Sequence, residues 1–263
     1  MKKDLIKITA LTNLHVGGGE ISYGVIDKLV QHDPATSFPI IHASSLKGAL
    51  KEYCEGSLAP PDLDLKNIFG NEEKPGQNKF FSAHLLTLPA RSNVKPWYNA
   101  TCPALIKDLI GILKNFGLSD QYNLLNKFYS IVRDISPQQF TLFTESCPAE
   151  IIIEDWTIPG ILNEGWETNL EKWFGTKEDL VLLRDDLFLE LCENLPVVAR
   201  NRTDERNLWF EELVPRQSVF WTIHLRPEND ENDIFEKVSK CHFPLHIGAN
   251  ATVGMGYCSV HPI

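Results

Sequence analysis

The amino-terminal stretch DLIKITALTNLHVGGG, residues 4–19, decides how the rest of the chain is interpreted. Residues 4–11 place Ile6, Ile8 and Ala10 on one side, the period of a β-strand with one face on a core. A run of three glycines then ends at Gly19, and consecutive glycines let a backbone approach a partner closely. We therefore expect a first strand followed by a glycine loop. No secretory signal is expected, because an apolar h-region is missing.

Helical and strand-like segments alternate beyond this stretch. A helix is expected at 44–54, begun by Ser44 or Ser45, and its apolar stripe predicts packing against a core. Other helices are expected at 104–116, at 121–135 and after Pro227, and strands at 219–226 and 257–260. The 219–226 strand is expected to place its apolar residues on one face. This alternation predicts an α+β fold of ferredoxin-like (RRM-like) type, with helices inserted into it.

The chain has 263 residues, 43% of them hydrophobic, and we expect one elaborated domain over 1–263. Its six cysteines form no C-x-x-C pair, which favours reduced thiols in the cytoplasm. No apolar run approaches the roughly 20 residues that span a bilayer, so no membrane partner is expected.

The charge is unevenly distributed along the chain. The formal net charge is −10, and the whole excess lies between Glu145 and Glu193. This acidic segment, expected to be helical, is typical of a solvated outer face. The rest of the chain is neutral and is free to carry local basic patches.

Three glycine-bearing segments suggest contact with a phosphate backbone. The first is the loop Gly17, Gly18 and Gly19, whose bare N–H groups suit phosphate oxygens. The second is the helix start with Ser44 and Ser45, where Lys47 and Lys51 share one face because they are four residues apart. The third, near the carboxyl terminus, contains Gly248, Asn250, Gly254 and Gly256. Each of them also occurs as a plain turn or a solvated helix; together they favour a nucleic-acid partner.

A fourth segment, residues 196–212, is expected to be a projecting β-hairpin. It carries Arg200, Arg202 and Arg206 near its expected tip, followed by a Trp-Phe pair. Such an arm can wedge into or stack on a nucleic acid, although an ordinary hairpin with solvated arginines has the same pattern.

These motifs resemble the RAMP superfamily, and more narrowly its fourth-subunit family in type III-B (Cmr) CRISPR effectors. The resemblance extends from about residue 5 to 260 and is carried by these runs: LHVGGG at 14–19, GVID at 24–27, SSLKGAL at 44–50, FFSAH at 80–84, LPARS at 88–92, VVARN at 197–201, LWFEE at 208–212, and residues 248–257.

The resemblance implies a specific role. Such proteins combine a ferredoxin-like palm with a hairpin thumb, here at about 195–215, and stack helically along a CRISPR guide RNA (crRNA) with other Cmr subunits. They cut the bound target RNA at regular intervals, and the matching catalytic position is Asp27. We expect Asp27 to bind Mg²⁺ or another divalent cation weakly, with RNA phosphates as further ligands. His15 is a lesser candidate base, and Glu211 or Glu212 is expected nearby, across a subunit junction.

Three alternatives stay open. One is a scaffold that binds guide RNA without cutting, and another is a guide-processing endoribonuclease with His15 as base. The third is a zinc hydrolase using His242 and His246. Their i, i+4 spacing needs a helix, whereas the Pro244 between them favours extended chain.

Overall fold

The computed structural model describes residues 1–19, 24–56, 63–134, 140–142, 151–157, 160–162, 168–202, 207–230 and 233–263. The chain divides into two compact units, and β4 (Ala83–Arg91) runs from the first into the second. The first unit combines residues 1–85 and 195–263, and the second comprises residues 86–194. The expectation of a single domain over the whole chain stays a prediction.

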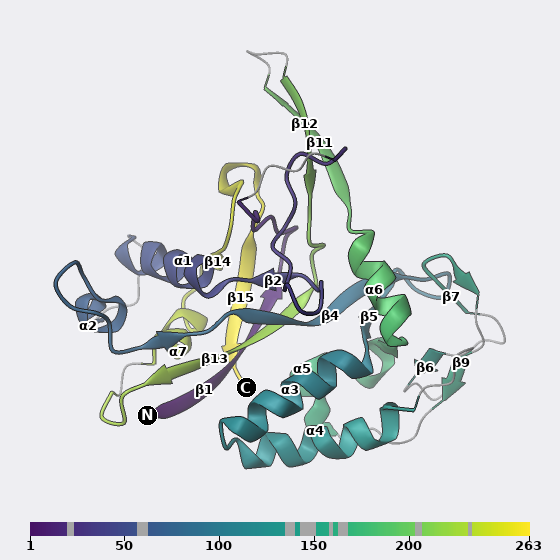
Figure 1. Cartoon of the computed structure of the whole chain (residues 1–263), viewed down its shortest axis with the longest axis horizontal. Helices are drawn as coiled ribbons and strands as arrows, with labels where there is room; N and C mark the ends of the chain where they lie inside the picture. The colour runs from purple at the N-terminus through teal and green to yellow at the C-terminus, as the bar shows by residue number, and fades with distance from the viewer. Residues whose placement is uncertain are drawn as a thin grey trace. The chain divides into compact units, whose positions relative to one another are not determined.

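The first unit is built on a mostly antiparallel sheet (Figure 1). Its strand order is β14 (Leu245–His246), β15 (Tyr257–Pro262), β1 (Lys2–Ala10), β13 (Val219–Arg226) and the start of β4. Two short strands extend it: β2 (Ile40–Ile41) pairs with β4, and β3 (Lys79–Phe80) pairs with β13. The expected strands at 4–11, 219–226 and 257–260 are therefore confirmed.

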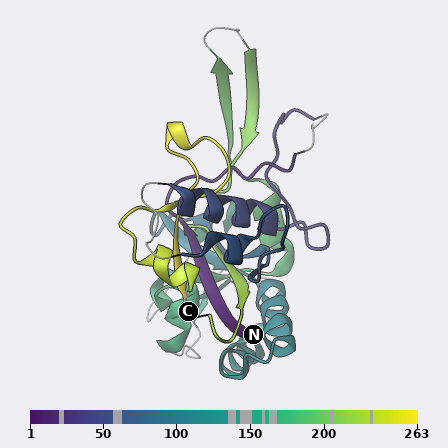
Figure 2. The same ribbon diagram turned by 90° about the vertical axis from the view of Figure 1, so that its left-hand side faces the viewer.

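Helix α1 (Ala43–Glu55) packs near β14 and β3 through Leu46, Leu50 and Cys54, and α2 (Leu65–Phe69) lies beside it (Figure 2). The predicted helix is confirmed, but the predicted serine cap is wrong. Residue 42 is the N-cap and makes no side-chain cap, so Ser44 and Ser45 lie inside the first turn.

Helix α7 (Ile234–Ser239) follows β13, and the Asp233 carboxylate caps it through the N–H groups of Phe235 and Glu236. Strand β13 differs from the one-sided expectation, because both of its faces are covered. Trp221 stacks on His84 on one face, and the fully buried His224 stacks on Phe80 on the other.

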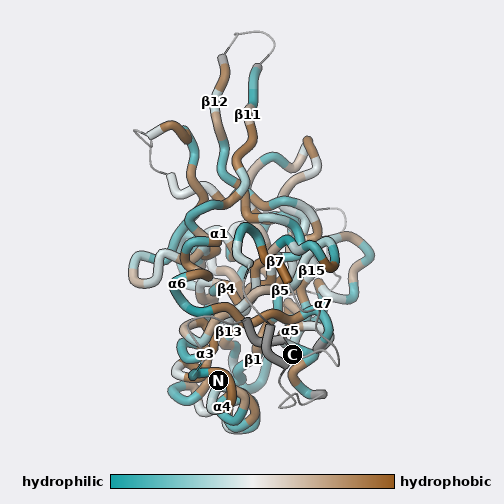
Figure 3. The backbone as a smooth tube through the Cα atoms, turned by 90° about the vertical axis from the view of Figure 1, so that its right-hand side faces the viewer, coloured by the Kyte–Doolittle hydropathy of each residue, from teal (hydrophilic) through white to brown (hydrophobic). Residues whose placement is uncertain are grey.

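The hairpin consists of β11 (Val197–Arg202) and β12 (Asn207–Glu212), which form their own two-stranded sheet. Their register pairs Val197 with Glu212 at the base and Arg202 with Asn207 toward the tip. The two strands have opposite hydropathy gradients (Figure 3): β11 is hydrophobic at its base and β12 is hydrophilic there. Two consecutive glutamates, Glu211 and Glu212, cause the hydrophilic base of β12.

The second unit continues β4 into a sheet with β5 (Trp97–Thr101), β10 (Leu180–Leu182), β6 (Phe140–Leu142) and β9 (Gly160–Leu162). Helices α3 (Pro103–Asn115) and α4 (Ser119–Val132) pack on each other, which confirms both predicted helices. Shorter elements complete it: β7 (Ile152–Ile153), β8 (Trp156–Thr157), α5 (Glu171–Phe174) and α6 (Asp185–Glu193). No helix in the described part of the chain is long and apolar enough to cross a membrane.

The acidic segment is not simply helical. Its described residues include strands β7 to β10 as well as α5 and α6. Several of its acids have partners inside the second unit: Glu154 pairs with Arg91 at 2.6 Å and Asp179 with Lys95 at 2.6 Å. Asp185 accepts the N–H of Ala104 at the start of α3. Part of the acidity is therefore structural.

The loop after β14 depends on Gly248, which has a positive φ of 88°. An added Cβ would lie 2.3 Å from the carbonyl oxygen of His15, which accepts the N–H of Ala249 at 2.9 Å. This glycine therefore permits the close approach of two loops from opposite ends of the chain.

Gly248→Ala is expected to lower the free energy of unfolding by about 3 kcal/mol, because backbone strain and the clash with His15 add. Gly254→Ala is the matched control, since Gly254 has a φ of 78° but open space around it. The control should lose only about 1 kcal/mol in urea unfolding. Equal losses would show that the two loops are not held together at Gly248.

Candidate nucleic-acid interface

Glu211 is the most connected side chain at the base of the hairpin, and its residue is only 1% exposed. One carboxylate oxygen accepts from Lys28 Nζ at 2.9 Å and Trp209 Nε1 at 2.7 Å. The other accepts from Asn250 Nδ2 at 2.9 Å and lies 2.7 Å from Arg200 Nε. Burial alone would raise the pKa of Glu211, but the bonds from Trp209, Lys28 and Asn250 outweigh it and lower this pKa to about 2.

Glu212 connects the hairpin to two segments of the chain between β1 and β2, one containing His15 and the other containing Val30. Its carboxylate accepts the N–H of Val30 at 3.0 Å, and its carbonyl oxygen lies 2.7 Å from His15 Nδ1. Its own N–H donates to the carbonyl of Lys28 at 2.9 Å. Both glutamates have bonding partners within this chain. Their expected place across a subunit junction stays a prediction.

Asp27 is held directly against β12 by reciprocal hydrogen bonds. The N–H of Phe210 donates to Asp27 Oδ2 at 2.7 Å, and the N–H of Asp27 donates to the Phe210 carbonyl at 3.1 Å. Asp27 is exposed, and among the described residues its other carboxylate oxygen, Oδ1, has no bonding partner. The hairpin strand thus orients one carboxylate oxygen and leaves the other accessible.

His15 occupies a different environment. It is 3% exposed, and an added Cβ on Gly17 would lie 3.3 Å from its Nε2. Its position favours a part in holding the loops over proton transfer to solvent-exposed RNA. Its catalytic role stays a prediction.

The first glycine loop uses some of its N–H groups internally. Gly18 donates to the carbonyl of Leu29 at 3.0 Å, so this N–H is not free for a phosphate. Gln31 extends the contact: its side-chain N–H₂ donates to the Gly17 carbonyl and to Ser45 Oγ, both at 3.1 Å. Gly19 is exposed, with open space around it. The first glycine loop and the start of α1 are therefore one connected surface.

The other residues expected to contact RNA differ in whether they are already bonded within the protein. On α1, Ser44 and Gly48 are exposed, Lys47 is half-buried, and Lys51 lies 3.8 Å from Glu55. In the third segment, Asn250 is bonded to Glu211, and Gly256 approaches the Ile247 carbonyl too closely for a Cβ.

The hairpin arginines do not form one group at the tip. Arg200 pairs across the hairpin with Trp209, and its guanidinium is directed to Glu211. Arg200 therefore stabilises the base of the hairpin, which corrects its expected place at the tip. Arg202 ends β11, and Arg206 lies outside the described residues.

A metal site around Asp27 is not assembled by the described residues alone. Glu211, the nearest carboxylate along β12, is already engaged by cations and N–H donors. Donor atoms of Asp4, His224 and Asp233 do lie within 4.8 Å of one another. However, Arg226 Nε is 2.6 Å from Asp4 and already supplies positive charge there.

The sequence missed three residues of this network: Lys28, Gln31 and Trp209. Lys28 and Gln31 both follow the GVID motif of residues 24–27, in an irregular loop without periodicity. The sequence predicts stacking on a nucleic acid for Trp209. In the structure its indole N–H donates to Glu211, and Lys28 Nζ lies 4.9 Å from its ring centre. No local pattern in the sequence marks this network, because the burial of Glu211 and Glu212 is a property of the tertiary structure.

The model of the RAMP superfamily matches residues 7–259, and the chain belongs to this superfamily. Among its relatives, the chain is 27% identical to the CRISPR system Cmr endoribonuclease Cmr4 of Pyrococcus furiosus, over 99% of this chain and 95% of that protein. It is 21% identical to the Cmr4 subunit of Saccharolobus solfataricus, covering 95% and 92% of the two chains. A solved structure of the type III-B Cmr-beta complex in its apo state contains a similar chain, with a TM-score of 0.78, 25% identity and coverage of 99% and 97%.

Glu211→Gln is expected to lower the free energy of unfolding by about 3 kcal/mol at pH 7, because the charge that holds Lys28 and Arg200 is lost. The pKa of Glu211 is depressed in the folded state. Its contribution is therefore complete above about pH 5 and decreases as the pH falls toward 2. Urea unfolding of both proteins at several pH values measures the difference, which should shrink below pH 5. A difference that stays constant down to pH 3 would contradict this network.

Proposed function

We propose that this protein is the backbone subunit of a type III-B CRISPR RNA-guided effector, which oligomerises along the crRNA and cleaves bound target RNA. Similarity over nearly the full length of a Cmr endoribonuclease supports this proposal. The proposed partners are crRNA, target RNA, further copies of the chain in a helical filament and other Cmr subunits. The assembled particle is proposed to act in the cytoplasm.

The observation that carries the proposal is the reciprocal bonding of Asp27 and Phe210. A hairpin that separates guide from target would place a displaced nucleotide near the base of the hairpin. Asp27 is held there by its bonds to Phe210. The accessible oxygen of Asp27 could then orient the 2′-hydroxyl of that nucleotide or accept its proton. Fixing the carboxylate in advance avoids ordering it during the reaction.

The proposed RNA path follows part of the connected surface: the exposed Gly19, Ser44 and Gly48 and the half-buried Lys47. Gly48 supports it, because a glycine inside a helix costs about 1 kcal/mol relative to alanine. An added Cβ at Gly48 would meet nothing within 4 Å, so packing among the described residues does not explain this glycine. Close approach of an RNA backbone would explain it.

We further propose that the first unit is a ferredoxin-like palm. Its central strands are ordered β15–β1–β13–β4, with α1 between β1 and β4 and α7 between β13 and β15. This order and these connections match a β-α-β-β-α-β arrangement.

The guide-processing alternative is less well supported. It requires an accessible His15, whereas this side chain is buried and bonded to Glu212. Specific cutting of unprocessed repeat RNA by the isolated chain without metal would favour that alternative. The zinc alternative is also disfavoured, since His246 lies in strand β14 and not on a helix with His242.

Asp27→Asn should reduce target cleavage by at least about 100-fold in the complex reconstituted with guide RNA, because the amide can still accept the Phe210 N–H but cannot take a proton. Guide binding and assembly should be unchanged. Asp108→Asn, an exposed aspartate on α3, is the matched control and should cleave like the unsubstituted protein. Full cleavage by Asp27→Asn would leave the non-cutting scaffold as the better description.

Cleavage is also expected to require a divalent cation. Asp27 offers one free carboxylate oxygen, so we propose that Mg²⁺ binds only with RNA phosphates as further ligands. EDTA should therefore stop cleavage by the assembled complex, and excess Mg²⁺ should restore it. In calorimetry the isolated chain should bind Mg²⁺ no tighter than about millimolar. Cleavage that continues in EDTA would refute the metal requirement.

A further inference from the structure

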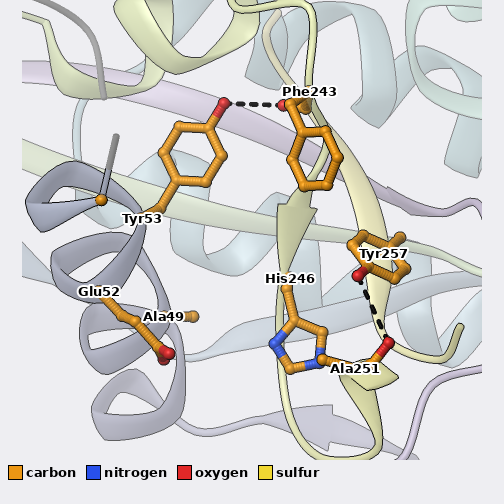
Figure 4. A pocket seen from close by; sticks show the side chains of 8 residues that line it. Ala49, Glu52, Tyr53, Phe243, His246, Ala251 and Tyr257 are labelled. Atoms are coloured by element: carbon orange, nitrogen blue, oxygen red, sulfur yellow. Dashed lines mark hydrogen bonds between the residues drawn. The ribbon is translucent and has the colours of Figure 1, made fainter. Parts of the chain in front are cut away.

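A pocket of about 260 Å³ lies in the first unit, between the second half of α1 and strands β14 and β15. Figure 4 shows the side chains that line it: Ala49, Glu52 and Tyr53 from α1, and Phe243, His246, Ala251 and Tyr257 from the opposite side. Its volume is below the roughly 300 Å³ at which small-molecule sites begin, so it suits one inserted side chain.

The walls of the pocket are aromatic and already held in place. Tyr53 donates its hydroxyl to the carbonyl of Phe243 at 2.8 Å, and Tyr257 donates to the carbonyl of Ala251 at 3.4 Å. Phe243 and His246 each meet the Tyr257 ring edge-on, with centroids 5.8 and 5.6 Å apart. Little reorganisation is therefore needed before a ligand binds.

Among the residues that line the pocket, Glu52 is the only carboxylate, and His246 is the only basic residue. It is exposed, and no ion pair or hydrogen bond engages its carboxylate among the described residues. The next acid, Glu55, is instead 3.8 Å from Lys51. The pocket thus combines aromatic faces with one available negative charge.

We propose that this pocket binds an arginine side chain of a protein partner. A planar guanidinium can stack on the aromatic rings and donate hydrogen bonds to the Glu52 carboxylate at the same time. An apolar side chain would bury that carboxylate without a partner, which is unfavourable. An RNA base would bring its phosphates toward Glu52 and Glu55, and no lysine or arginine lines the pocket to offset the repulsion.

The test titrates the full chain with N-acetyl-arginine amide and follows the histidine ring signals by NMR, with His246 assigned by substitution. Saturable binding is expected, weakened about tenfold for the neutral isostere N-acetyl-citrulline amide and about threefold for N-acetyl-lysine amide. Glu52→Gln should weaken arginine binding about tenfold, and Phe243→Ala should also weaken it.

Glu55→Gln is the matched control, because it removes the neighbouring charge outside the pocket, and it should leave binding unchanged. Thermal unfolding of each variant verifies that the fold is intact. Absence of saturable arginine binding, or an equal loss for Glu55→Gln, would overturn the proposal. GMP binding that is tighter than arginine binding and depends on Phe243 would overturn it in favour of a nucleobase site. The outcome is independent of target cleavage, since none of these residues belongs to the Asp27 network.

Discussion

The buried glutamate pair at the base of the hairpin is the interaction on which the rest of the proposed RNA site depends. Glu211 and Glu212 follow each other on β12 and are 1% and 5% exposed. A buried carboxylate is costly unless charges and N–H donors surround it. Meeting this requirement draws the loop containing Lys28 and Val30, and the loop containing Asn250, onto one strand.

The same constraint explains why Asp27 has a defined position although it is exposed. Irregular loops usually have many conformations, and an isolated surface carboxylate is poorly placed for chemistry. Here Phe210, the residue that precedes the buried pair, forms two hydrogen bonds with Asp27. Its carbonyl accepts the N–H of Asp27, and its own N–H donates to the Asp27 carboxylate. Movement of the hairpin therefore carries the proposed catalytic oxygen with it. In the proposed mechanism, recognition and cutting are therefore joined in one element.

The net charge of −10 is compatible with this function because the acids are not spread evenly. Arg91 and Lys95 neutralise two acids of the second unit, and Asp185 caps a helix there. In the first unit, Lys47 lies on α1, and Ser45 of that helix is joined to the first glycine loop through Gln31. In the proposed assembly, RNA is contacted by main-chain groups and a few cations, and bulk charge matters less.

Local patterns in the sequence determined the principal strands and helices, since the periods of β1, α1 and β13 follow from how each element buries its own side chains. The family motifs likewise singled out Asp27. The bonding of Arg200, Lys28, Trp209 and Asn250 to one carboxylate was decided only by the tertiary structure. These residues come from three regions of the chain, and no local pattern encodes the desolvation of Glu211 that brings them together. The fold class was thus present in the sequence, whereas the site arose from contacts between distant loops.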